Sequence, residues 1–165
     1  MVAEVARSRV EDFFAALATR DPQLIGPFLA HDVDWLIVGP VELFPFCGQH
    51  VGKDAVLAVY ERMSKGQHVL EYVRDQLVVE GSSGAALVRV RASQKETGRE
   101  GQVRIAQFVR FSGDQVVEFC SILDSLSAAE QALGHAIDFS APAPATVPGE
   151  FEDAGIRAYR RAQSP

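Results

Sequence analysis

Two polar residues, Gln107 and His50, could take part in proton transfer next to the carbonyl group of a ligand. Gln107 interrupts the alternating apolar face of a predicted strand, between Ile105 and Val109. A buried amide without a partner costs about 1–3 kcal/mol, so Gln107 either orients a ligand carbonyl or bonds to a neighbour in the core. His50 precedes a predicted helix and is either a general base or a surface residue of its loop.

The other charged residues that could act on a ligand can each be explained by a structural role instead. By strand parity, Asp34 points away from Trp35 and toward the outer face, and Asp124 is placed to cap the start of the last helix. Arg89 and Arg91 share one face of a strand whose other face is apolar. They either lie on a charged outer face of the sheet or bind an anionic ligand in the pocket. The second role is chemically possible because the guanidinium of arginine binds carboxylates with two hydrogen bonds.

Neither a metal nor a cofactor is expected. His31, His68 and His135 have no metal-ligand spacing with one another or with a cysteine. Cys47 and Cys120 lie far apart and are expected to be free buried thiols. Phosphate-binding loops, dinucleotide fingerprints and nucleophile elbows are missing from the sequence, so no nucleotide cofactor is predicted.

Length and charge narrow the class of protein. A chain of 165 residues is long enough for one domain with its own core. A net charge of −6 argues against nucleic-acid binding, which usually needs a basic patch. The sequence contains neither a signal peptide nor an apolar run long enough to span a membrane. A cytoplasmic protein with no membrane partner is therefore expected.

Apolar periodicity predicts the order α-α-β-α-β-β-β-β-α, an α+β fold. The predicted helices cover residues 2–17, a short segment capped by Asp21, residues 53–65 and a segment after a Ser127–Glu130 capping box. The predicted strands cover residues 32–39, 68–80, 85–94, 102–111 and 115–123. Short glycine-containing connectors make the last four an antiparallel meander, which must curve around the first and third helices.

The domain boundary follows from composition. Residues 1–138 form the predicted domain, and residues 139–165 form a proline-rich tail with a possible short docking helix. Within the domain, the loop "VGPVELFPFC" (residues 38–47) is unusual because loops are normally polar. Its apolar side chains either pack on the core or wall a cavity.

Three stretches resemble the nuclear transport factor 2-like superfamily, and within it the SnoaL-like and ketosteroid-isomerase-related group. They are "FFAALATRDPQLIGPFLAHDVDW", "GQHVGKDAV" and "FVRFSGDQVVEFCSILDSL". The resemblance covers roughly residues 5–135 and implies a cone: a curved, cystatin-like sheet that wraps around helices and encloses one apolar pocket. The apolar loop would then form part of the rim of that pocket.

The catalytic positions of the ketosteroid isomerases are mostly replaced. Those enzymes use a tyrosine and a protonated aspartic acid as oxyanion donors, and a second aspartate as base. The tyrosine position corresponds to Phe13, and the base position to Ile37 or its neighbour Val38. The second oxyanion donor corresponds to Gln107. Steroid isomerisation by that mechanism is therefore not expected.

Limonene epoxide hydrolases, which are similar in fold, use an Asp-Arg-Asp constellation. Arg89 matches the arginine, but Arg91 and Ser121 stand in place of the two acids. Epoxide hydrolysis by that constellation is not expected either.

The residues and the resemblance together predict a SnoaL-like small-molecule enzyme of the isomerase, cyclase or lyase type. It would act by proton transfer on an apolar, carbonyl-bearing substrate, with Gln107 orienting the carbonyl and His50 moving the proton. The alternative is a non-catalytic module that binds an apolar ligand or only dimerises. The predicted ligand-binding residues are Phe13, Leu17, Trp35, Ile37, Tyr60, Val88, Phe119 and Ser121.

Two of these predictions leave an alternative open. Trp35 either fills the core, as large aromatic residues usually do, or offers a flat surface to a ring-shaped ligand. The Tyr60 hydroxyl either bonds a ligand or reaches solvent. On the convex face of the sheet, Phe108 lies between Arg104 and Arg110, and such an apolar patch predicts a twofold homodimer.

Overall fold

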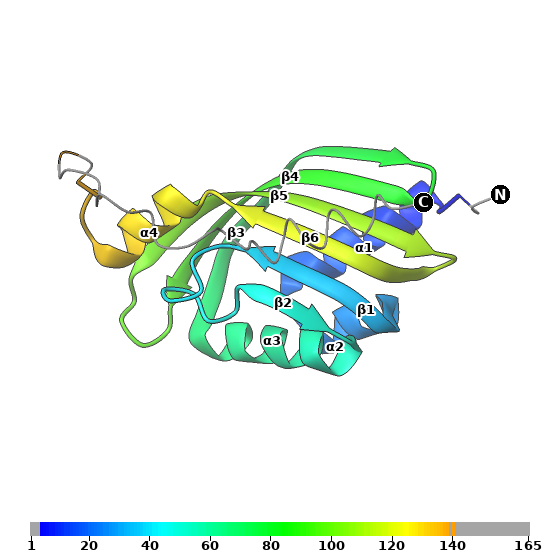
Figure 1. Ribbon diagram of the computed structural model, residues 1–165, viewed down its shortest axis with the longest axis horizontal. Coiled ribbons are helices and arrows are strands. Elements are labelled where there is room, and N and C mark those ends of the chain that lie inside the picture. The colour runs from blue at the N-terminus through cyan, green and yellow to red at the C-terminus, as the bar shows by residue number, and fades with distance from the viewer. Residues whose placement is uncertain (1–3, 139, 141–165) are drawn as a thin grey trace, which may run out of the picture.

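The computed structural model describes residues 4–138 and residue 140, which form one curved sheet with helices packed against it (Figure 1). In chain order the elements are α1 (Arg7–Thr19), α2 (Pro22–Ile25), the 3-10 turn η1 (Gly26–Phe28), β1 (Leu29–Val38), β2 (Gly48–Val51), α3 (Lys53–Gly66), β3 (Gln67–Glu80), β4 (Ser83–Gln94), β5 (Glu100–Ser112), β6 (Gln115–Leu123) and α4 (Ser125–Leu133). The predicted α+β class is confirmed. The tail predicted for residues 139–165, and its docking helix, lie outside the described residues apart from Ser140.

The sheet has the strand order β2-β1-β6-β5-β4-β3. The predicted meander is confirmed, because β3 to β6 pair antiparallel in sequence order. The predicted antiparallel sheet of five strands is wrong in two respects, since the sheet has six strands and β1 pairs parallel with β6. β2 pairs with one edge of β1. The chain then passes through α3 and the meander, and its last strand, β6, pairs with the other edge of β1 in the same direction.

The sixth strand is β2, which lies where a loop was predicted. It pairs antiparallel with β1, and His50 is opposite Trp35. Gly48 and Gly52 bracket it with φ values of 110° and 90°, a conformation that glycine adopts without steric cost. Four residues are too few to separate a strand from a loop by alternation, which explains the difference from the prediction.

The caps of the helices follow local chemistry. The Asp21 carboxylate accepts a hydrogen bond from the Gln23 amide at 2.8 Å, and Pro22 occupies the first turn of α2, as predicted. Helix α4 starts two residues earlier than its predicted capping box. Asp124 is its N-cap and accepts from the Ser127 amide at 3.2 Å, while Glu130 instead accepts from the Ile137 amide.

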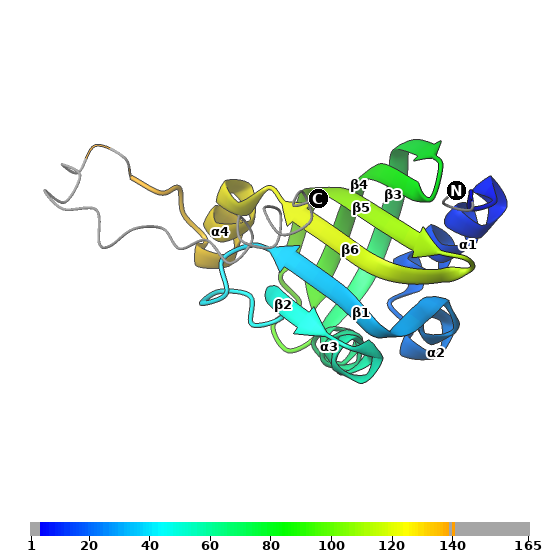
Figure 2. The same cartoon turned by 45° about the vertical axis from the view of Figure 1, so that its right-hand side comes forward.

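The sheet curves around its helices (Figure 2). Helix α3 packs against β1, β2 and β3, and α1 packs against β3. The register of β3 against β4 shifts between Val69 and Glu71 and again between Arg74 and Gln76. Such irregularities bend a strand and increase its twist, so they help the long β3 to wrap around the helices.

Phe13 of α1 lies at the centre of the core and is fully buried. Its ring centroid lies 5.4–6.3 Å from five other aromatic rings, which are those of Phe14, Phe28, Trp35, Phe111 and Phe119. Trp35 and Phe119 stack on each other at 3.9 Å between centroids. Edge-to-face and offset contacts of this kind add to the free energy gained from burial. One end of the curved sheet is therefore packed solid.

The convex face of the sheet carries charge and scattered apolar side chains. Arg89 makes a two-pronged hydrogen bond to the Asp75 carboxylate at 2.8 and 2.9 Å, and Arg91 pairs with Glu100 at 3.0 Å. The open question about these arginines is thereby answered in favour of the outer face. Phe108 is 49% exposed on the same side, and the homodimer predicted through it stays a prediction.

No helix among residues 4–138 is long and apolar enough to cross a lipid bilayer.

The role of Phe13 leads to a stability prediction. We expect Phe13→Ala to lower the free energy of unfolding by about 3–5 kcal/mol, because it removes a ring that contacts several others and leaves a cavity. Urea denaturation followed by circular dichroism measures the change. Leu24→Ala, at a side chain that is half exposed, is the matched control and should cost far less. Equal losses in the two variants would contradict the central role of Phe13.

Candidate functional site

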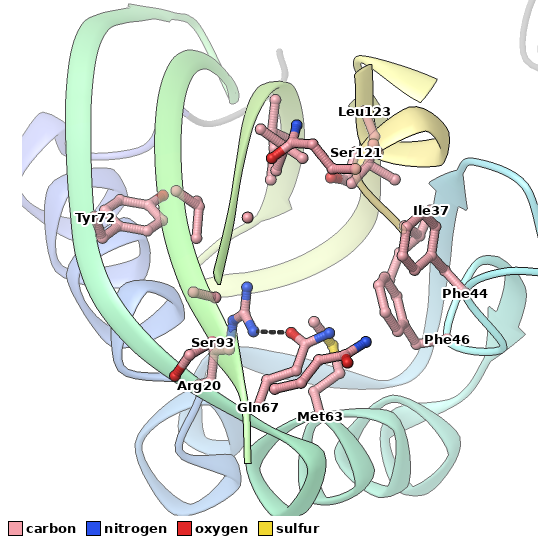
Figure 3. A pocket seen from close by; sticks show the side chains of 18 of the residues that line it. Arg20, Ile37, Phe44, Phe46, Met63, Gln67, Tyr72, Ser93, Ser121 and Leu123 are labelled. Atoms are coloured by element: carbon pink, nitrogen blue, oxygen red, sulfur yellow. Dashed lines mark hydrogen bonds between the residues drawn. The ribbon is translucent and has the colours of Figure 1, made fainter. Parts of the chain in front are cut away.

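A cavity of about 160 Å³ opens at the other end of the curved sheet, between α1, α3, the loop after β1 and the concave face of the strands (Figure 3). Most of its lining is apolar. Leu17, Ile37, Val90, Ile105 and Met63 are among the lining side chains. The expected apolar pocket is therefore present in the fold.

The apolar loop after β1 forms one wall of this cavity, as the sequence predicted. The rings of Phe44 and Phe46 line the cavity, with their centroids 5.6 Å apart. A turn holds the loop, because the carbonyl of Pro40 accepts hydrogen bonds from the amides of Leu43 and Phe44. Burial raises the pKa of the Cys47 thiol to about 11, so Cys47 packs as an apolar residue at neutral pH.

The start of that loop needs a residue without a side chain. A Cβ atom at Gly39 would lie 2.7 Å from Cys47 Sγ and 2.7 Å from a methyl carbon of Leu123. Gly39 therefore lets the loop close tightly over the end of β6. This close approach is what brings the phenylalanines of the loop over the cavity.

Gln107 of β5 points into the cavity and is only 6% exposed. Its Oε1 accepts a hydrogen bond from the Tyr72 hydroxyl at 3.1 Å. Ser121 of β6 is its cross-strand partner and is also buried at the cavity wall. Gln107 thus bonds a neighbour in the core through its oxygen. Its Nε2 has no protein acceptor among residues 4–138, so the role in orienting a ligand stays a prediction.

Two tyrosine hydroxyls are held neutral beside the cavity. Burial raises the pKa of Tyr72 to about 12, and it raises the pKa of Tyr60 well above its ordinary range. Both phenols therefore stay protonated at neutral pH and can donate a hydrogen bond. The Tyr60 hydroxyl has no hydrogen-bond partner within the described part of the chain, so it is available to a ligand.

Arg20 is the residue that sequence reasoning missed. It ends α1 in a left-handed conformation with φ of 56°, and its Nη1 donates to Gln67 Oε1 at 2.5 Å. Burial lowers the pKa of this guanidinium, while the two tyrosines act on it in the opposite sense. No carboxylate of the described residues lies within 4 Å of it.

A signal for Arg20 was present in the sequence. Phe13, Leu17 and Arg20 follow one another at steps of four and three, so they continue one face of α1. The first two are buried and face the sheet, so the third is carried inward as well. Its place in "TRDP" suggested only the end of a helix.

The structure brings together five of the ten predicted site residues. Those that line the cavity are Leu17, Ile37, Tyr60, Gln107 and Ser121. Four others lie in the packed core next to the cavity, where they are fully or almost fully buried: Phe13, Trp35, Val88 and Phe119. His50 lies on β2, and its Nε2 is 3.1 Å from the carbonyl oxygen of Phe46 rather than at the cavity wall.

Acidic and metal-binding groups at the site are few. Glu100 is the one carboxylate among the described lining residues, and it pairs with Arg91 at the exposed mouth. The described residues contain no group of three or more His, Cys, Asp or Glu side chains that could hold a metal ion.

The arrangement therefore offers hydrogen-bond donors to an apolar space. Arg20, Tyr60, Gln107 and Ser121 can each donate to an oxygen atom in the cavity. Donors that are fixed in a cavity of low dielectric bind a carbonyl oxygen strongly and stabilise negative charge that develops on it.

The Tyr72–Gln107 hydrogen bond can be tested by a double-mutant cycle. We expect Tyr72→Phe alone to lower the free energy of unfolding by about 1–3 kcal/mol, because it leaves the buried amide oxygen without a donor. In a Gln107→Leu background the same change should cost less, with a coupling of at least about 0.5 kcal/mol. Urea denaturation of the four proteins gives the cycle. Additive losses would show that the two side chains do not interact.

Comparison with known proteins agrees with this geometry. The SnoaL-like domain family matches residues 10–119. A crystal structure of a "Putative Isomerase" from Rhodopseudomonas palustris is 29% identical, with a TM-score of 0.73 over 79% of this chain and 100% of that one. An NTF2-like protein from Burkholderia xenovorans is 23% identical, with a TM-score of 0.62 over 76% of this chain and 93% of that one.

An "LEH-like epoxide hydrolase" of M. tuberculosis shares the fold at 14% identity, with a TM-score of 0.62 over 77% of this chain and 88% of that one. No curated protein matches the chain. Isomerases, cyclases and epoxide hydrolases thus occur on this fold. Because the family match spans most of the ordered sheet and its helices, this chain belongs to the SnoaL-like domain family and has the NTF2-like α+β fold.

Proposed function

We propose that this chain binds a small, largely apolar molecule in the cavity and holds it by an acceptor oxygen such as a carbonyl. The observation that carries the proposal is the set of neutral donors at an otherwise apolar wall. Gln107, Tyr60 and Ser121 line the cavity, and each carries an N–H or O–H group that can donate. Buried donors normally find an acceptor, and a ligand oxygen would supply one.

The size of the cavity sets the size of the ligand. Its volume of about 160 Å³ is close to that of an apolar cavity of about 150 Å³ in another protein, which binds benzene. A ligand with one ring and a short substituent therefore fits this space.

The proposal predicts a preference between two molecules of the same shape. Acetophenone and α-methylstyrene differ in that a carbonyl oxygen replaces a methylene group. We expect acetophenone to bind roughly tenfold more tightly, a difference of about 1.4 kcal/mol, because its oxygen meets the donors. Isothermal titration calorimetry measures both affinities. In Gln107→Leu, which cannot donate, the preference should shrink.

Two neighbouring residues of β6 give a matched control for the location. Leu123 lines the cavity, whereas the preceding Ile122 is exposed on the convex face. Leu123→Trp should fill the cavity and abolish acetophenone binding, and Ile122→Trp should leave it unchanged. Equal binding by both variants would place the ligand elsewhere and refute the proposal.

A second candidate is proton transfer in the same cavity. It is favoured by the similarity to the structure named as a "Putative Isomerase". The donors would stabilise an enolate oxygen, and a base would remove the neighbouring proton. His50 Nε2 is 3.1 Å from the carbonyl oxygen of Phe46, and His50 is not among the lining residues. Glu100 is the one carboxylate among the described lining residues, so it would be the base.

Proton exchange distinguishes this candidate from binding alone. If the chain catalyses enolisation, it should accelerate the exchange of the methyl hydrogens of acetophenone in heavy water, as followed by proton NMR. We expect Glu100→Gln to abolish that acceleration and Arg91→Gln, which removes only the ion-pair partner, to retain it. Exchange at the buffer rate in the wild-type protein would leave binding as the function.

A further inference from the structure

We propose that the ligand of this pocket carries a carboxylate and that Arg20 binds it; this inference rests on the proposed small-molecule binding. The chemical class is thereby narrowed from any apolar carbonyl compound to an apolar monocarboxylic acid. The carboxylate would lie at the α1 end of the cavity, and the apolar body would extend toward Phe44 and Phe46 (Figure 3).

The pairing of the arginines gives the first reason. Four arginines at the surface have a carboxylate partner, in the pairs Arg7–Glu11, Arg89–Asp75, Arg91–Glu100 and Arg110–Glu118. Arg20 is a half-buried residue of the cavity wall, and its partner within residues 4–138 is the neutral amide of Gln67. A charge that is partly withdrawn from water is normally compensated by an opposite charge, and the cavity is where a ligand could bring one.

The backbone at Arg20 gives an independent reason. Among the described residues, Arg20 is the one non-glycine residue with a positive φ, at 56°. It closes α1 by donating its amide hydrogen to the carbonyl of Leu17. Glycine fills such a C-terminal position without strain, so nothing in the cap itself calls for a long cationic side chain. Backbone strain of this kind gathers where a side chain has to be presented to a ligand.

The surroundings suit an anion. The guanidinium has five N–H donors in a planar fork, and Gln67 takes up one side of it. Tyr60, whose hydroxyl is a neutral donor, lines the same cavity as Arg20. A carboxylate has two oxygens and can accept from the guanidinium and from a phenol at the same time. Among the described lining residues, the Glu100 carboxylate that would repel it is already paired with Arg91.

Phenylacetate and phenylacetamide test this inference. They share one ring and the same shape, but phenylacetate is an anion at neutral pH. In the wild-type protein we expect phenylacetate to bind roughly tenfold or more tightly than the amide, by isothermal titration calorimetry. Arg20→Gln should remove this preference, and Arg20→Lys should keep part of it.

Arg99 provides the matched control. It is the other arginine that lines the cavity, but it lies exposed at the mouth and donates to the carbonyl of Ala132. Arg99→Gln should keep the full preference for phenylacetate. As a measurement that needs no variant, the Arg20 side-chain Nε–H signal in the NMR spectrum should shift on titration with phenylacetate and stay in place with phenylacetamide.

The outcomes separate this inference from the function on which it rests. If both compounds bind equally well and Arg20→Gln changes neither, the pocket binds small molecules but the carboxylate inference is overturned. If Arg99→Gln removes the preference, or the Arg20 signal does not move, the inference is likewise overturned. If neither compound nor acetophenone binds, the proposed function itself fails.

Discussion

The packing of aromatic rings around Phe13 decides where this molecule is solid and where it is hollow. The ring contacts side chains from α1, η1, β1, β5 and β6, and thus joins the first helix to the central strands. One turn further along α1, Leu17 lines the cavity. The same helix therefore seals one end of the sheet and lines the opening at the other.

This division also explains the altered chemistry at the first helix. Phe13, the residue that the resemblance to ketosteroid isomerases matches with an oxyanion donor, is part of the core and lies outside the cavity. The donors come from other elements: Tyr60 from α3, Gln107 from β5, Ser121 from β6 and Arg20 from the end of α1. The cavity thus keeps hydrogen-bond donors while the carboxylates of the related enzymes are missing from its described lining.

Much of the fold followed from the sequence, because long elements carry strong periodic signals. The helix around Val56 and Val59 and the four strands of the meander were predicted within a few residues. Strand β2 was missed because four residues give no usable period. The parallel pairing of β1 with β6 was missed because pairing between distant strands depends on the path of the whole chain rather than on local pattern.

The site was predicted less completely, for a physical reason. Parity along a strand shows which side chains point inward, and it correctly predicted that Ile37 and Gln107 lie on the concave face. It does not show where the inward side chains meet and where they leave a space. Trp35 and Phe119 point inward too, but they stack on each other and fill the core. Tyr72 and Arg20 were overlooked because they lie near the ends or irregular parts of their elements.

The wall built by the loop after β1 differs from the other walls in how it is held. The strands are fixed by ladders of backbone hydrogen bonds, whereas this loop is closed by its own turns and by the tight contact at Gly39. Insertions or deletions within residues 40–46 would change the size of the cavity without changing the register of any strand. Diversity of ligands across such proteins can thus arise from the length of a single connector, while the scaffold beneath it stays as it is.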